Sequence, residues 1–142
     1  MNAIFLSMDS ILKQQILERA QKIPIFQTLG FEIVKLDAGM CKTVVKHEKK
    51  YDGIFESFHG GLLMTVADSI SALAVLTMAG ADAPITTTDM NIRFLAPCRS
   101  DVTAAAKIIK YGRTMCPVAI ELFDEKGIKV AIAQVNYMIL RK

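Results

Sequence analysis

A single carboxylate stands inside a long apolar stretch of this sequence. Residues 55–76 read FESFHGGLLMTVADSISALAVL, and Asp68 is the only charged residue from position 60 to position 80. An ionised carboxylate on a buried helix is unfavourable unless it is paired, hydrogen-bonded or close to water. In a cleft, Asp68 would be suited to act as a base or a nucleophile. The alternative is that it marks the one polar stripe of the helix, together with Thr65 and Ser69.

A histidine and two glycines precede the same apolar stretch. His59, Gly60 and Gly61 lie where a loop is expected to become a helix, and glycines there let a ligand approach backbone N–H groups at the positive end of the helix dipole. Such donors suit a developing oxyanion. The alternative is that the glycines only shape a tight entry to the helix, while His59 bonds to loop backbone.

The spacing of these residues constrains how they can cooperate. Eight residues separate Gly60 from Asp68, which on one helix is roughly 12 Å along the axis. A carbonyl under attack needs its oxyanion donor and its attacking group each within about 3 Å. If both residues are catalytic, we expect a composite site, with Gly60 from one subunit and Asp68 from its partner across a two-fold axis. An active monomer would contradict this expectation.

The flanking sequence predicts the elements that position these residues. An amphipathic helix is indicated by DSILKQQILERAQKIP and stops before Pro24. Alternating segments on either side of DAG predict a hairpin, and Gly80 and Pro84 close the apolar helix. Four further strands are predicted from TTTDMNIRFLAP, DVTAAAKIIKYG and the hairpin TMCPVAIELFDEKGIKVAIAQVNYMIL. These elements predict an α+β domain with an antiparallel sheet, in which a second subunit helps to cover the apolar helix.

Composition excludes several classes of function. The chain has 142 residues, 52% hydrophobic and 22% charged, and a net charge of +3, which predicts one globular domain. Three cysteines without a C-x-x-C pair predict reduced, buried thiols in a cytoplasmic protein. The hydroxyls and the carboxylate of the apolar helix make it a poor membrane span. The basic run KHEKK lacks aromatic residues for base stacking, so no nucleic acid is expected, and two scattered histidines predict no metal site.

The ordered set of motifs HGGLLMTVAD, TTTDMNIRFLAP, KYGRT and KVAIAQVNYMI resembles the hotdog-fold acyl-CoA thioesterases of the PaaI-like branch, from Gly30 to Ile139. The resemblance implies five or six antiparallel strands wrapped around a long central helix. It implies a single domain over 1–142, with an N-terminal helix in 1–24 and the hotdog core in 29–141. It also implies homodimers or homotetramers with active sites at subunit interfaces.

The resemblance carries catalytic roles to four positions. The family's carboxylate, a general base or a nucleophile, falls on Asp68, and the glycine whose N–H polarises the thioester carbonyl falls on Gly60. The motif histidine falls on His59, which we expect to shape the loop and the thioester pocket. An assisting hydroxyl falls on Thr87, with Thr86 and Thr88 as neighbouring candidates.

One position departs from the family pattern. Many relatives have Asn or Gln six residues before the motif histidine, where this chain has Gly53. Substitutes for the missing amide are available in Asp52, Glu56 and Ser57. The substrate-binding candidates are Gly53, Gly61, Arg93 and Arg113, and Arg113 is preferred over Arg93, Arg99 and Lys110 for the phosphates of coenzyme A.

The sequence therefore predicts an acyl-CoA thioesterase that needs no cofactor, because coenzyme A is part of the substrate. The first alternative is a non-catalytic acyl-CoA binding or sensing module, motivated by Gly53. A hotdog dehydratase acting on 3-hydroxyacyl thioesters ranks last, because the HFPG signature is missing.

Overall fold

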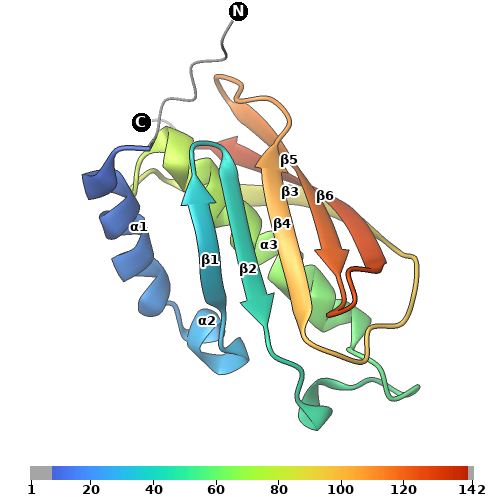
Figure 1. Ribbon diagram of the computed structural model, residues 1–142. Coiled ribbons are helices and arrows are strands. Elements are labelled where there is room, and N and C mark those ends of the chain that lie inside the picture. The colour runs from blue at the N-terminus through green and yellow to red at the C-terminus, as the bar shows by residue number, and fades with distance from the viewer. Residues whose placement is uncertain (1–7, 141–142) are drawn as a thin grey trace, which may run out of the picture.

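A six-stranded antiparallel sheet curls around one long helix in the computed structural model, which describes residues 8–140 (Figure 1). The strand order is β1-β2-β4-β5-β6-β3, so β1 and β3 are the two edges. The strands are β1 (Glu32–Asp37), β2 (Met40–Val45), β3 (Ile85–Phe94), β4 (Val102–Ile108), β5 (Met115–Phe123) and β6 (Lys129–Ile139). The predicted hotdog architecture is confirmed, with six strands.

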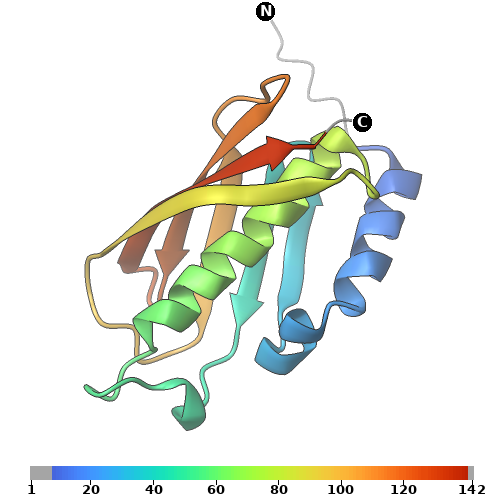
Figure 2. The same cartoon turned by 180° about the vertical axis from the view of Figure 1, so that it is seen from behind.

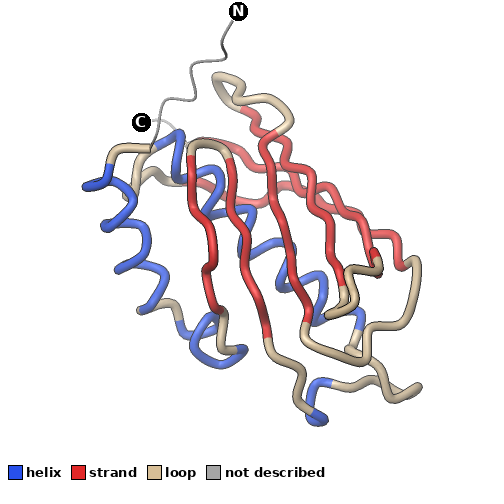
Figure 3. The backbone as a smooth tube through the Cα atoms, viewed as in Figure 1, coloured by secondary structure: helices blue, strands red, loops and turns tan. Residues whose placement is uncertain are grey.

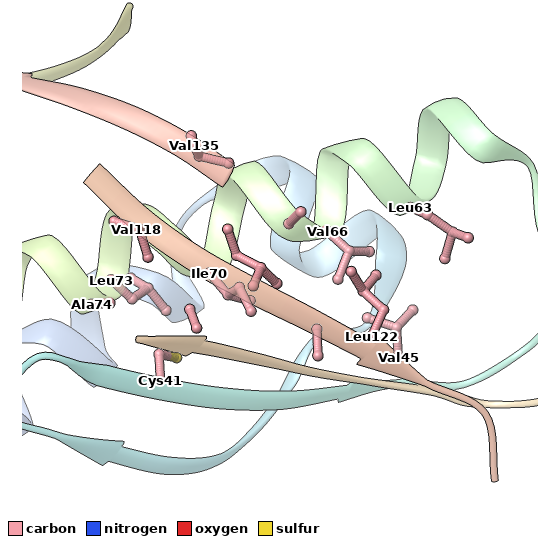
Figure 4. Packing of buried hydrophobic residues seen from close by; sticks show 14 of the residues in the cluster. Cys41, Val45, Leu63, Val66, Ile70, Leu73, Ala74, Val118, Leu122 and Val135 are labelled. Carbon is pink, nitrogen blue, oxygen red and sulfur yellow. The ribbon is translucent and has the colours of Figure 1, made fainter. Parts of the chain in front are cut away.

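The central helix α3 spans Gly60–Ala79, and its ends follow from local chemistry. His59 caps its first turn through the imidazole, and Gly80, with a φ of 110°, ends it. Leu63, Val66, Ile70 and Leu73 recur at three- and four-residue spacing and pack onto the sheet (Figure 4). Although α3 is long and apolar enough to span a membrane by composition, it is the core helix of this domain.

Two helices precede the sheet. Helix α1 (Ser10–Gln21) is capped by the Asp9 carboxylate and buries Ile16 and Ala20. The predicted stop before Pro24 is right for α1, but Pro24 also begins a short second helix, α2 (Pro24–Leu29), that the sequence analysis missed. Proline suits the first helical position because the N–H it lacks would have no intrahelical acceptor. Figure 2 shows α1 beside the sheet edge that carries β1.

Both predicted hairpins are confirmed, and β3 contains an irregularity. Gly39 and Gly127 provide the positive φ values at the β1–β2 and β5–β6 turns (Figure 3). In β3 the pairing with β6 shifts register between Thr87 and Asp89, which is a β-bulge at Thr88. Residues after the bulge therefore face the side of the sheet opposite to the one that strict alternation counted from Thr87 predicts.

The three cysteines are buried free thiols, as predicted. Cys41 lies on β2, Cys116 on β5, and Cys98 in the connection between β3 and β4. Burial raises the pKa of the Cys41 thiol to about 12.

Candidate active site

The Asp68 carboxylate is anchored through one of its two oxygens. The Thr87 hydroxyl donates to Oδ1 at 2.7 Å, and the Tyr137 hydroxyl lies 2.8 Å from the same oxygen. The Tyr137 hydroxyl also lies 2.7 Å from the Asp68 backbone oxygen. Within residues 8–140, no donor contacts Oδ2. The carboxylate is thus fixed in orientation while one oxygen stays available to a substrate or a water molecule.

The two hydroxyls reach Asp68 because their strands are paired. Thr87 on β3 and Tyr137 on β6 are cross-strand partners, and both face the helix. Tyr137 is almost fully buried, and this burial, with the negative charge of Asp68, raises the pKa of its hydroxyl. Tyr137 therefore remains a neutral donor. Tyr137 was not among the predicted site residues, although strand alternation places it inward with Val135 and Ile139.

A cavity of about 490 Å³ with a largely apolar wall opens beside Asp68. Its walls come from the end of α1 and the start of α2, the middle and second half of α3, the connection from α3 into β3, and Tyr137 of β6. Arg19 and Asp82 are charged residues of this lining. Its apolar lining residues include Ile23, Ile25, Phe26, Ala72, Leu76 and Ile85. A carboxylate at the edge of such a cavity could meet the reactive end of an apolar acyl group.

The first turn of α3 offers one unused backbone donor. The Nδ1 atom of His59 accepts the Gly61 N–H at 3.0 Å, so the backbone donor of Gly61 is already engaged. Gly60 is the first helical residue, so its N–H has no intrahelical acceptor, and no hydrogen bond between described residues uses it. The Gly60 N–H is therefore the backbone donor available to an oxyanion.

A hollow of about 400 Å³ lies against Gly60 and is lined by Ser57, Leu63, Phe94 and Pro97, among others. The Phe94 ring lies so close to Gly60 that an added Cβ would be 2.9 Å from its Cζ atom. A side chain at this position would displace the ring. A glycine here lets the Phe94 ring pack against the backbone and leaves the N–H accessible.

Gly60 and Asp68 are separated along one continuous helix. Both lie on α3, so eight residues at about 1.5 Å each place them roughly 12 Å apart along its axis. The structure confirms that Gly60 and Asp68 lie on one continuous helix, as the predicted spacing of roughly 12 Å requires. Within one chain, the open Asp68 oxygen and the Gly60 N–H are too far apart to act on the same carbonyl.

The loop before α3 contains the residues considered as substitutes for the missing amide. Gly53 lies against His59, and its N–H donates to the Ser57 carbonyl at 2.8 Å. Asp52 is bound to His47 at 2.6 Å, and Glu56 is exposed. Of the three substitutes, only Ser57 lines the hollow at Gly60.

Of the predicted hydroxyl and basic residues, only Thr87 lies beside Asp68. Thr87 contacts Asp68, whereas Thr86 and Thr88 are exposed. Arg93 lies on the sheet face opposite α3, beside Asn91 and Gln134. Arg113 lies in the turn between β4 and β5, at the other end of the sheet from Gly60 (Figure 1). Within one chain, neither arginine is brought to Asp68 or Gly60.

No group of three or more His, Cys, Asp or Glu side chains is arranged to hold a metal ion in residues 8–140.

Comparison with known proteins shows four similarities. Residues 55–131 match the family model described as the thioesterase superfamily. Human acyl-coenzyme A thioesterase 13 is 28% identical over 117 residues, which cover 79% of this chain and 82% of that protein. The E. coli PaaI protein from the phenylacetic acid degradation operon has a similar structure, with a TM-score of 0.87 and 20% identity over 95% of this chain and 97% of that one.

A structure that contains coenzyme A is also similar. It is a hypothetical thioesterase protein from Streptococcus pneumoniae TIGR4, with a TM-score of 0.73 and 23% identity over 79% of this chain and 87% of that one.

Proposed function

This chain belongs to the thioesterase superfamily, and on that premise we propose that it hydrolyses an acyl-CoA thioester to a free acid and coenzyme A. The observation that carries the proposal is the asymmetry of Asp68, whose Oδ1 is held by two hydroxyls while Oδ2 has no partner within residues 8–140. The similarity to human acyl-coenzyme A thioesterase 13 and to a coenzyme A complex supports the substrate class.

In the proposed reaction, Asp68 Oδ2 either removes a proton from the attacking water or itself adds to the thioester carbon. The carbonyl oxygen then becomes an oxyanion, which the Gly60 N–H stabilises. When the tetrahedral species collapses, the carbon–sulfur bond breaks and coenzyme A leaves as a thiolate. On the general-base route, the proton that Asp68 takes from water passes to the thiolate, whose thiol has a pKa of about 8.5. On the nucleophilic route, the acyl group remains on Asp68 as a mixed anhydride. A water molecule then hydrolyses this anhydride to the free acid, and a proton from that water goes to the thiolate.

We propose that two subunits share each site, because of the 12 Å spacing along α3. Two further features support a second copy at this face. Strand β3 is a ten-residue edge strand, and edges of this length are templates for pairing. On α3, Gly61, Thr65, Asp68 and Ala72 form a stripe that the sheet leaves partly exposed. Antiparallel packing of two such helices brings Gly60 of one chain to Asp68 of the other.

The test is turnover by purified protein on a panel of short, long and aromatic acyl-CoAs, with free thiol as the readout. Asp68→Asn keeps the acceptor for both hydroxyls but removes the base, so we expect a loss of at least about 100-fold. The matched control is Asp89→Asn, a carboxylate on the opposite face of the sheet, which should retain wild-type rates. Full activity of Asp68→Asn, or of a monomer in sedimentation, would contradict the proposal.

Gly53 favours a second candidate, a non-catalytic acyl-CoA binding module. That function predicts calorimetric binding of acyl-CoA with no thiol release from any substrate in the panel.

A further inference from the structure

The loop before Gly60 presents two apolar side chains to water. Ile54 and Phe55 are 89% and 80% exposed. The loop that carries them is ordered: the Gly53 N–H donates to the Ser57 carbonyl, and Asp52 and Phe58 form a β-bridge. An ordered loop that exposes adjacent isoleucine and phenylalanine side chains is typical of a surface that binds a partner.

This loop does not serve the cavity of its own chain. It projects beyond the first turn of α3 and away from α1 in both views (Figures 1 and 2). The cavity beside Asp68 has Ile23, Ile25 and Phe26, from the α1–α2 segment, in its wall. The Ile54–Phe55 tip and the cavity are thus at opposite sides of the same subunit.

If two subunits share each site, as the proposed function requires, the position of the Ile54–Phe55 tip in the dimer can be inferred. If Gly60 lies against the partner's Asp68, the two antiparallel helices cross near Met64. The chain before Gly60 then runs along the partner's α3 toward its C-terminal end. In that arrangement the C-terminal half of the partner's α3, whose Ala72 and Leu76 line the partner's cavity, lies on the side toward which the chain before Gly60 runs. The Ile54–Phe55 tip therefore lies on the cavity side of the partner.

We infer that Ile54 and Phe55 of one subunit close the acyl cavity of its partner and limit the length of acyl chain that the partner's Asp68 can process. The tip buries its apolar surface against the acyl chain and the cavity wall, which explains why an exposed loop carries isoleucine and phenylalanine. The ligand class is an acyl group that is apolar along its length.

The first test is the ratio of kcat/KM for long over short acyl-CoAs in Phe55→Ala. Removing the ring lengthens the closed cavity, and we expect the ratio to rise by about tenfold, the scale at which apolar pockets discriminate single methylenes. Because Phe55 is exposed, its removal should leave folding unchanged. Ile109→Ala is the matched control, an exposed apolar residue beside the β4–β5 turn, and should keep the wild-type ratio.

A mixed dimer tests whether the loop acts across the interface. Two differently tagged chains are co-expressed, one with Asp68→Asn and the other with Phe55→Ala, and dimers that carry both tags are isolated. The only intact carboxylate belongs to the Phe55→Ala chain, but the loop that faces it comes from the other chain and retains Phe55. We expect the wild-type ratio. A ratio equal to that of the Phe55→Ala homodimer would overturn the inference, as would an unchanged ratio in that homodimer.

A binding measurement separates failure of this inference from failure of the proposed function. Thioether analogues of acyl-CoA cannot be hydrolysed, and the ratio of Kd for a long over a short analogue reports the acyl cavity, because the coenzyme A part is the same in both. If no substrate turns over, a tenfold change in the long-over-short Kd ratio of Phe55→Ala still supports the inference, and an unchanged ratio overturns it.

Discussion

The Tyr137 hydroxyl should be essential for holding Asp68 in its reactive orientation, and Tyr137→Phe removes that group alone. The hydroxyl lies 2.8 Å from Oδ1 and is buried with the rest of the side chain. A hydrogen bond to a charged group contributes about 1.5 to 3 kcal/mol, and we take the lower figure because Asp68 is half-buried. That free energy corresponds to a loss of about tenfold in kcat.

The role predicted for Tyr137 is positioning, so kcat should fall while KM changes little. Free thiol release gives both constants, and urea unfolding gives the stability, which should fall by about 1.5 kcal/mol. Tyr111→Phe, outside the site, is the matched control and should alter neither.

Thr87→Val tests the second donor to the same oxygen. Combined with Tyr137→Phe, it leaves Oδ1 without a donor, so the loss in kcat should exceed the product of the two single losses. Wild-type kcat in Tyr137→Phe, or strictly multiplicative losses in the double variant, would refute the proposed anchoring of Asp68.

Two further predictions concern packing and pH. Gly60→Ala should destabilise the fold by about 1 kcal/mol because its Cβ displaces the Phe94 ring, and adding Phe94→Ala should recover most of that loss; additive losses in urea unfolding would contradict the contact. For Cys41, burial raises the thiol pKa from 9.0 to about 12, so the folded state binds this proton more tightly than the unfolded state. Its contribution is therefore complete below pH 9 and is lost as pH rises toward 12, at up to about 1.4 kcal/mol per pH unit. Cys41→Ala should show a shallower decline in unfolding free energy over that range, and equal slopes would argue against a buried thiol.

The strands and the central helix could be predicted because each depends on local pattern. Alternation marks the strands, and Gly80 marks the end of α3. The short helix α2 was missed because a proline is the signal for the end of one helix and also for the start of another. Here Pro24 follows the end of α1 and is the first residue of α2. Boundaries of this kind depend on whether the following residues can pack, as Phe26 and Leu29 do here.

The site was only partly predictable, because its contacts depend on sheet register. Thr87 and Arg93 are six residues apart, so strict alternation would place them on one face of β3. The bulge at Thr88 separates them: Thr87 faces Asp68, and Arg93 faces away from α3. Tyr137 is 69 residues from Asp68 in sequence, and only the pairing of β3 with β6 brings it there. A tyrosine on the inward face of a predicted strand was the available signal, because a buried phenol needs a hydrogen-bond partner.

The three buried thiols allow local opening of the fold to be measured, because a thiol reagent labels each cysteine only when the structure around it opens. Cys41 and Cys116 belong to β2 and β5, so a thiol reagent reaches them only when the sheet opens. Cys98 differs, because its carbonyl accepts the Phe58 N–H and ties it to the loop that carries Ile54 and Phe55. Cys98 also lines the hollow at Gly60, so its alkylation rate should report opening of that loop and hollow, and bound acyl-CoA should slow the labelling of Cys98 more than that of Cys41 or Cys116.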